Sequence, residues 1–147
     1  MIRRFGETAR PGIRYRPRAG VYAILPRDGR VLVTHQDEPV PELQLPGGGI
    51  DPGESPLRAL FREVREETGW AIARPRRLGT FRRFTFMPEY DLWAEKICTV
   101  YLADPVRARG APSEPGHSAL WISATHAMRA LGNAGDRHFV SRVARRL

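Results

Sequence analysis

The sequence contains one cysteine, one lysine and no long hydrophobic run. Because a single cysteine, Cys98, cannot form an internal disulfide, a disulfide-stabilised scaffold is excluded and we expect a cytoplasmic protein. Cys98 lies in an apolar run, so we interpret it as a small buried side chain rather than a nucleophile. No apolar stretch approaches the roughly 20 residues that a membrane-spanning helix requires, and the arginine-rich start lacks the apolar core of a signal peptide. We therefore expect no membrane contact.

Although lysine is almost absent, the chain has a formal net charge of +8, which comes almost entirely from arginine. A basic surface attracts polyanions such as nucleotides or RNA, but the charge by itself only permits such partners. The length of 147 residues fits one compact domain. We assign residues 1–18 to a basic tail or edge strand, a candidate for homodimer contacts, and residues 19–147 to a single domain.

Several segments have the residue pattern of strands and others that of helices. The first two strands are expected to form a hairpin around Pro26-Arg27-Asp28-Gly29, which is a favourable turn sequence. We expect strands at residues 21–25, 30–35, 43–46, 73–87, 93–102 and 119–123, and helices at 56–68, 125–131 and 136–146. This mixture predicts an α/β fold in which helices flank a mixed sheet in an α/β/α arrangement.

Three glutamates, Glu63, Glu66 and Glu67, fall on the first predicted helix. Positions i, i+3 and i+4 lie on one face of an α-helix a few Å apart, so the three charges repel one another unless a cation lies among them. Mg²⁺ and Mn²⁺ are hard cations that take oxygen ligands and bridge phosphate oxygens. The spacing therefore predicts a site for one of these metals.

The ends of this helix and its apolar stripe are also recognisable. Ser55 or Glu54 is expected to cap its first turn, which Pro56 suits, and Gly69 is expected to end it. The carboxylates are centred away from the apolar stripe, so we expect them to face solvent partly or wholly. The stripe is formed by Leu57, Leu60, Phe61, Val64 and Thr68.

Arg62 and a glycine-rich loop complete the local pattern. Arg62 adjoins Glu63 and reaches Glu66 at i+4, so its guanidinium is suited to hold a carboxylate through two hydrogen bonds. Upstream, Leu45-Pro46-Gly47-Gly48-Gly49 is expected to be a strand end that runs into a loop. Glycines there allow positive φ angles and let the backbone approach a ligand or metal closely.

Read in order, these residues follow the pattern G-x5-E-x7-R-E-[apolar]-x-E-E-x-G-[apolar], which resembles the Nudix box of the Nudix hydrolases. Val64 and Trp70 fill the apolar positions, and Trp70 departs mildly from the aliphatic residue more usual in the family. The fixed positions are filled by Gly48, Glu54, Arg62, Glu63, Glu66, Glu67 and Gly69. The resemblance implies a Nudix-type α/β/α sandwich with a mixed central sheet.

The resemblance also implies roles for individual residues. Mg²⁺ or Mn²⁺ would be held by the helix glutamates, with a backbone carbonyl near Gly47 or Gly48, while Glu54 supports the loop or an outer metal. The implied metal-binding residues are Gly48, Glu54, Glu63, Glu66 and Glu67. The implied catalytic residues are Glu63, Glu66, Arg62 and Glu114. Arg62 would orient a glutamate, and the general base stays open among Glu63, Glu66 and Glu114.

Glu114 enters because the family often supplies a further carboxylate from the loop before the last strand, which a tryptophan marks. Glu114 stands seven residues before Trp121. Its rivals for this role are Glu89, Asp91 and Glu95. His117 lies in the same loop, and we interpret it as a surface histidine, with phosphate contact as the alternative. Four aromatic residues are expected in the core rather than against a base: Phe84, Phe86, Tyr90 and Trp93.

The sequence thus favours a metal-dependent hydrolase of a diphosphate linkage in a nucleoside diphosphate derivative, such as an NTP or dNTP, ADP-ribose or a dinucleoside polyphosphate. Two alternatives remain. In the first, the chain senses a nucleotide without turnover. In the second, it acts on RNA, either by removing pyrophosphate from 5′ ends or only by binding. The motif could also be explained as an acidic helix face that only contacts solvent, but this explanation accounts for neither the glycines nor the isolated Glu54.

Overall fold

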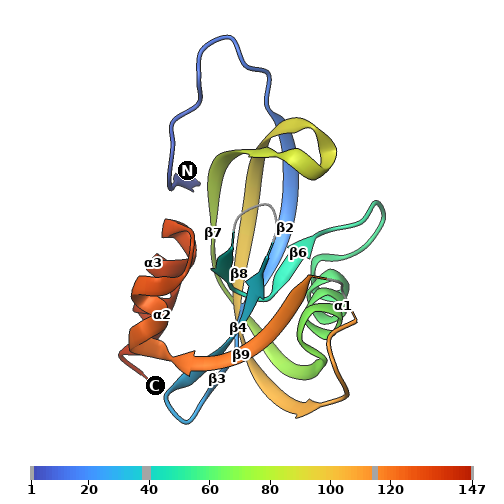
Figure 1. The fold of residues 1–147 in the computed structure, drawn as a ribbon, viewed down its shortest axis with the longest axis vertical. Helices are drawn as coiled ribbons and strands as arrows, with labels where there is room; N and C mark the ends of the chain where they lie inside the picture. The colour runs from blue at the N-terminus through green and yellow to red at the C-terminus, as the bar shows by residue number, and fades with distance from the viewer. Residues whose placement is uncertain (1, 38–40, 114–115, 147) are drawn as a thin grey trace.

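A computed structural model describes residues 2–37, 41–113 and 116–146. Figure 1 shows its helices and strands coloured along the chain. In chain order the elements are β1 (Arg3–Arg4), β2 (Arg16–Ile24), β3 (Pro26–Arg27), β4 (Arg30–Gln36), β5 (Glu42–Gln44), β6 (Gly47–Gly49), α1 (Pro56–Thr68), β7 (Trp70–Met87), the 3-10 turn η1 (Pro88–Tyr90), β8 (Leu92–Ala108), β9 (His117–Ser123), α2 (Ala124–Ala130) and α3 (Ala134–Ala144).

The larger sheet has five strands in the order β1-β7-β8-β2-β6. Strands β7 and β8 form a long antiparallel hairpin through η1, whereas β8 runs parallel to β2 and β2 runs antiparallel to β6. The sheet is therefore mixed, as predicted. Its order places the glycines of β6 at the edge beside β2, with Tyr22 opposite Gly47 and Val21 opposite Gly48.

The smaller sheet is built around β4, which pairs with β3, β5 and β9. The prediction of a hairpin between residues 21–25 and 30–35 was wrong in its pairing, because β2 runs alongside β8 instead. Pro26 and Arg27 pair with β4 around a turn at Asp28 and Gly29 that has positive φ angles, and the Leu32 amide donates to the Leu25 carbonyl at 3.1 Å. The turn lies where the local sequence predicts it. The strand before the turn, β2, instead pairs in parallel with the distant strand β8.

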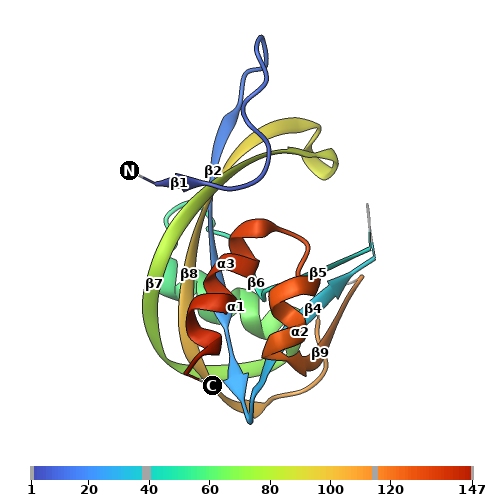
Figure 2. The ribbon, with the colours of Figure 1, turned by 90° about the vertical axis from the view of Figure 1, so that its left-hand side faces the viewer.

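Helices cover both sides of the strands, with α1 on one side and α2 and α3 on the other (Figures 1 and 2). On the α1 side, Leu60 and Val64 pack in a cluster with Val21 and Ala23 of β2. On the other side, a second cluster is formed by residues including Ile24, Phe81, Leu131, Phe139 and Val140. This arrangement confirms the predicted α/β fold with helices flanking a mixed sheet. No α-helix in the described part of the chain is long and apolar enough to cross a membrane.

The segment before β2 forms an arm along the upper part of the larger sheet (Figure 2). Its strand β1 runs parallel to β7, with Arg3 opposite Phe81, and the Phe5 ring lies edge-on to the Phe81 ring with centroids 5.6 Å apart. Strand β2 already begins at Arg16. The division of the chain at residue 18 stays a prediction.

A candidate active site between helix α1 and the glycine strand

Helix α1 begins and ends where the sequence predicts. The Ser55 hydroxyl accepts a hydrogen bond from the Arg58 amide at 3.2 Å, and Gly69 ends the helix with φ at 77°. The predicted apolar stripe is only partly buried, because Leu57 and Phe61 are exposed while Leu60 is fully buried. Helix α1 is therefore rotated so that its buried face also includes Ala59 and Glu67.

The rotation corrects the expectation that the carboxylates face solvent. The side chains of Glu63 and Glu67 are only 13% and 7% exposed, whereas that of Glu66 is 42% exposed. Glu63 and Glu67 lie next to the buried Leu60 and Val64 on the helix, so their side chains lie against the edge of the larger sheet at β6. There the side-chain-free strand β6 leaves room for two carboxylates.

Strand β6 contacts these two glutamates directly. The Gly47 amide donates a hydrogen bond to Oε1 of Glu67 at 2.9 Å. A Cβ atom added to Gly48 would lie 2.6 Å from Oε2 of Glu63, closer than side chains approach in proteins. Gly47 has a φ of 152°, and a Cβ there would collide with the Val21 carbonyl at 2.1 Å. Glycine is therefore required at position 47, whereas a side chain at position 48 would displace the Glu63 carboxylate.

Arg62 joins the loop before α1 to the helix glutamates. Its Nε and Nη2 donate to the two carboxylate oxygens of Glu54 at 2.7 and 2.8 Å. Its Nη1 donates to Glu63 at 3.0 Å and to Glu66 at 3.3 Å, and Nη2 also donates to the Gly49 carbonyl at 3.2 Å. The predicted bidentate contact of Arg62 therefore exists, but its partner is Glu54 rather than a helix glutamate.

These hydrogen bonds have electrostatic consequences. The Arg62 guanidinium, with help from the Asp51 amide, lowers the pKa of Glu54 to about 2. In return, the bond to Glu54 raises the pKa of Arg62. Glu54 is thus ionised at neutral pH, and its two oxygens accept from Arg62 and from the Asp51 amide. This arrangement suits a residue that fixes the loop, so the metal-binding role of Glu54 stays a prediction.

The donor set fits a hard divalent cation in its chemistry. Three carboxylates and the adjoining glycine backbone offer only oxygen ligands, which Mg²⁺ and Mn²⁺ prefer. Gly48 provides a cradle against Glu63 that any side chain would fill. Within residues 2–37, 41–113 and 116–146, no three acidic, histidine or cysteine side chains converge closely enough to hold an ion, and Arg62 bridges Glu63 and Glu66 instead.

A cleft of about 260 Å³ opens beside this site. Its wall includes the β6 glycines, Glu63 and Glu67, and it continues to polar residues that sequence reasoning missed, among them the buried Asp136. These residues are Tyr22, Arg83, Lys96, Asn133 and Asp136. One signal was available in the sequence, because Lys96 is the only lysine of an arginine-rich chain and lies within an apolar strand.

Burial shifts the ionisation of several groups around the cleft. It raises the pKa of Asp136 to about 6 and that of Cys98 to about 11, and it raises the pKa of Tyr22 as well. Burial, together with the nearby Arg83 charge, lowers the pKa of Lys96. Cys98 is buried in the core cluster, as its apolar surroundings predict. Burial in this part of the cleft therefore disfavours the charged forms of Tyr22, Lys96, Cys98 and Asp136.

The residues expected outside the motif are spread over several places. Glu114 lies outside the described residues, although the Ser113 amide donates to the Glu66 carbonyl at 2.9 Å. Among its rivals, Glu89 lines the cleft, whereas Glu95 pairs with Arg82 at 3.0 Å. The expectation of a surface His117 was wrong, because its side chain is 13% exposed and its Nε2 lies 3.6 Å from Oε2 of Glu67.

The four aromatic residues also separate. Tyr90 lines the cleft with the Arg18 guanidinium 4.7 Å from its ring centroid. Phe84, Phe86 and Trp93 instead surround a different cavity, beside the N-terminal arm. Phe86 and Tyr90 are exposed, and Phe84 and Trp93 are half-buried outside both core clusters, so the expectation that these aromatic residues lie in the core was wrong.

Comparison with known protein sequences adds independent information. Residues 14–143 match the family model for the NUDIX domain. A Bacillus subtilis protein named "Putative 8-oxo-dGTP diphosphatase" is 35% identical over 78 residues, which cover 53% of this chain and 52% of that protein. An RNA pyrophosphohydrolase of Cereibacter sphaeroides is 45% identical over 65 residues, or 43% of this chain and 40% of that one. The chain thus spans about half, or less, of the length of these curated relatives.

Solved structures resemble the whole fold. The MutT NUDIX hydrolase from Burkholderia pseudomallei superimposes with a TM-score of 0.72 at 26% identity, covering 87% of this chain and 98% of that one. The MutT protein from Methanosarcina mazei Go1 gives a TM-score of 0.69 at 24% identity, covering 92% and 98% of the two chains. At such identities the likeness rests mainly on the arrangement of the elements.

Proposed function

Because the chain belongs to the NUDIX family, we propose that the site between α1 and β6 hydrolyses a diphosphate linkage in a nucleoside diphosphate derivative, with Mg²⁺ or Mn²⁺ as its cofactor. The observation that carries this proposal is the contact of Glu63 and Glu67 with Gly48 and Gly47 at the wall of a cleft. It brings acidic side chains and the glycine backbone together at the wall of this cleft, where an anionic substrate and a cation can meet.

The chain's own residues would share the work. Glu63, Glu66 and Glu67 would hold the metal, and the carbonyls of the glycine strand would add oxygen ligands. When bound, a divalent cation neutralises the phosphate oxygens that repel a nucleophile and makes water a stronger acid. Arg62 keeps the carboxylates in place through its hydrogen bonds. A carboxylate takes the proton from the attacking water, with Glu63, Glu66 and Glu114 as the candidates.

The substrate class is inferred from the names of the relatives and from the charge of the chain. The names of the relatives point to a nucleotide or to an RNA 5′ end, and the excess of arginine suits either polyanion. We propose that the base lies in the cleft beyond the acidic site, beside its polar side chains. We therefore propose a nucleoside 5′-triphosphate or a related diphosphate derivative, with RNA 5′-pyrophosphate removal as the alternative.

The experiment that tests this proposal is a hydrolysis screen of the purified protein with Mg²⁺, with Mn²⁺ and with EDTA. The panel contains canonical and oxidised (d)NTPs, ADP-ribose, NADH, nucleotide sugars, dinucleoside polyphosphates and 5′-triphosphate RNA. Turnover should require the metal and should be lost in Glu66→Gln. We choose Glu66 because it is the most exposed of the three glutamates, so its replacement disturbs the fold least.

A matched control is Glu95→Gln, which also removes one glutamate charge but lines neither the cleft nor the acidic site. It should retain the activity of the wild type. Equal turnover by wild type and Glu66→Gln would contradict the proposed site. Nucleotide binding, measured by thermal shift, without any product would instead favour the sensing module.

A further inference from the structure

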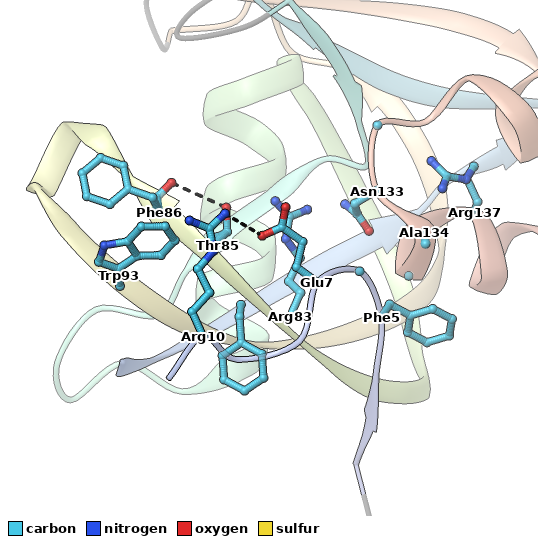
Figure 3. Close-up of a pocket in the computed structure, with 14 residues that line it drawn as sticks. Phe5, Glu7, Arg10, Arg83, Thr85, Phe86, Trp93, Asn133, Ala134 and Arg137 are labelled. Carbon is cyan, nitrogen blue, oxygen red and sulfur yellow. Dashed lines mark hydrogen bonds and ion pairs between the residues drawn. The ribbon is translucent and has the colours of Figure 1, made fainter. Parts of the chain in front are cut away.

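A second cavity, of about 470 Å³, lies outside the site described above. It is bordered by the arm before β2, by the far ends of β7 and β8, and by the turn between α2 and α3 (Figure 3). We refer to it as the arm cavity. Its volume falls within the range of pockets that bind small molecules, about 300–1,000 Å³.

One side of the arm cavity is aromatic. Phe86 on β7 lies directly opposite Trp93 on β8, with their ring centroids 5.2 Å apart. The two rings lie together at one end of the cavity (Figure 3). Phe86 is 40% exposed, which is unusual for a large apolar side chain in a strand. Exposed aromatic rings of this kind serve as stacking surfaces for nucleic acid bases.

The charged lining of the arm cavity is predominantly positive, with Arg10, Arg83 and Arg137 against the single acid Glu7. Arg10 contacts Glu7 at 3.4 Å, and its guanidinium lies 5.0 Å from the Trp93 ring centroid. Arg137 donates to the Leu131 carbonyl. Within the described residues, the Arg83 side chain makes no hydrogen bond or ion pair. The cavity thus combines an aromatic surface with arginines suited to phosphate.

The arm cavity adjoins the cleft beside α1. Arg83 and Asn133 line both of them, so the two share a wall. The cleft in turn reaches the glycines of β6 and the acidic residues Glu63 and Glu67. A ligand with its diphosphate at the acidic site would have to pass Arg83 and Asn133 to reach the aromatic rings.

We propose that the arm cavity binds a second nucleotide unit of the substrate, lying beyond the diphosphate that is cleaved. The second base stacks against Phe86 and Trp93, and the connecting phosphate faces Arg10 and Arg83. Substrates with two nucleotide units, either a 5′-triphosphate oligoribonucleotide or a dinucleoside polyphosphate, are then bound better than a single nucleotide. This inference rests on the proposed function, because that function places the cleaved linkage at α1.

The test compares three probes with the Mg²⁺-loaded protein: ATP, diadenosine tetraphosphate and the dinucleotide pppApG. The wild type should have a higher kcat/KM for at least one two-nucleotide probe than for ATP. Arg10→Ala and Phe86→Ala should each lower kcat/KM for that probe by about tenfold, the scale of losing one base-stacking contact. Both should leave kcat/KM for ATP within about twofold. The favoured probe shows which two-nucleotide substrate fits.

Arg129→Ala is the matched control, because Arg129 is an exposed arginine on α2 that lines neither cavity. It removes the same charge and should leave all three probes unchanged. Arg10→Ala keeps the Arg10 amide that donates to the Tyr15 hydroxyl at 3.0 Å, so the arm should stay folded. Equal effects of Arg10→Ala on ATP and on the two-nucleotide probes, or no effect on any, would overturn the inference while the hydrolase proposal stands.

If the wild type hydrolyses none of the three probes, binding decides the inference, while the wider hydrolysis screen decides the proposed function. Fluorescence anisotropy then measures the affinity for pppApG carrying a 3′-fluorescein. Weaker binding by Arg10→Ala and Phe86→Ala, with unchanged binding by Arg129→Ala, would support a nucleotide site in the arm cavity. Equal affinities in all variants would overturn it.

Discussion

Arg62 donates to three glutamates, Glu54 before α1 and Glu63 and Glu66 in its second half, whose charges would otherwise repel one another. Its planar guanidinium satisfies both oxygens of Glu54 with one pair of donors and reaches Glu63 and Glu66 with another nitrogen. A lysine carries the same charge but has no fork of fixed donors. The geometry of the site therefore depends on arginine at this position and not only on a positive charge.

We expect Arg62→Lys to lower kcat/KM and the affinity for Mg²⁺ by about 10- to 100-fold, as for other residues that orient metal ligands. The measurement is turnover as a function of Mg²⁺ concentration, with the melting temperature as a check on folding. Arg58→Lys is the control, since Arg58 is exposed on the same helix. Equal activities of the two variants would show that Arg62 has no positioning role.

Asp136 makes stability depend on pH in an unusual direction. Burial raises its pKa from the ordinary value of 3.8 to about 6 in the folded protein. The folded state therefore holds a proton over a range in which the unfolded state has lost it. This contribution to stability is complete below pH 3.8 and is lost as the pH rises through about 6.

We expect Asp136→Asn to remove this dependence. The free energy of unfolding of the variant, relative to the wild type, should rise between pH 4 and pH 7 by up to about 3 kcal/mol, the value of a pKa shift of about 2 units. Urea unfolding in EDTA across this range measures it. A difference between the two proteins that stays constant with pH would mean that Asp136 does not titrate in this way.

Individual residues show where sequence reasoning was sufficient. The spacing of Glu63, Glu66 and Glu67 predicted one acidic cluster because it depends only on helix geometry. The burial of Glu67 was not predictable, since it depends on how α1 rotates against a strand distant in the sequence. The Arg62–Glu54 pair was missed for a related reason, because the loop brings Glu54 back over the helix.

At the scale of elements, β6 contributes through its lack of side chains. Gly48 has no room for a Cβ beside Glu63, whereas a Cβ at Gly49 meets nothing within 4 Å. Neither residue has a positive φ. Substitutions at Gly48 and Gly49 can therefore be compared. The comparison distinguishes the effect of crowding the Glu63 carboxylate from the general effect of replacing a glycine in this strand.

We expect Gly48→Ala to displace the Glu63 carboxylate and to lower kcat/KM by about 10- to 100-fold, because small misplacements of catalytic groups are costly. Gly49→Ala should keep most of the activity. Steady-state kinetics with Mn²⁺ titration measures both effects. Similar losses in the two variants would mean that the close contact at Gly48 has no special importance.

The end of α1 offers a matched pair for stability. Gly69 and Gly53 both have φ angles near 78°, but a Cβ at Gly69 would lie 2.0 Å from the Gly110 carbonyl, while nothing lies within 4 Å at Gly53. Gly53→Ala should cost about 1 kcal/mol for the left-handed conformation, and Gly69→Ala about 2–5 kcal/mol because of the added collision. Chemical unfolding measures both, and equal costs would contradict the packing of α1 against the segment after β8.

The elements themselves were predicted unequally. The bounds of α1 follow from Ser55 and Gly69, which act locally. The parallel pairing of β2 with β8 was missed because it joins segments more than 70 residues apart, from Arg16 opposite Ala94 to Ile24 opposite Leu102. Turn residues act locally and do not indicate which distant strand will pair with a segment. The sequence therefore predicted that the sheet is mixed, but the order of its strands was known only from the structure.

At the scale of the whole molecule, one mixed sheet connects the acidic site, the cleft and the arm cavity. Strand β2 joins β6, which carries the glycines, to β8, which carries Lys96, Cys98 and, at its far end, Trp93. The arm pairs with the middle of β7 through β1 and reaches the Trp93 ring through Arg10. The sequence motif predicted the first of these three sites, whereas the other two depend on long-range packing.

The most direct test of the central claim is a Mg²⁺ titration of turnover with the best substrate of the screen, in wild type, Glu66→Gln and Glu95→Gln side by side. Saturable, metal-dependent hydrolysis by the wild type and by Glu95→Gln, with none by Glu66→Gln at any Mg²⁺ concentration, is the predicted result. Hydrolysis by Glu66→Gln with the Mg²⁺ dependence of the wild type would contradict the assignment of the metal and of the chemistry to helix α1.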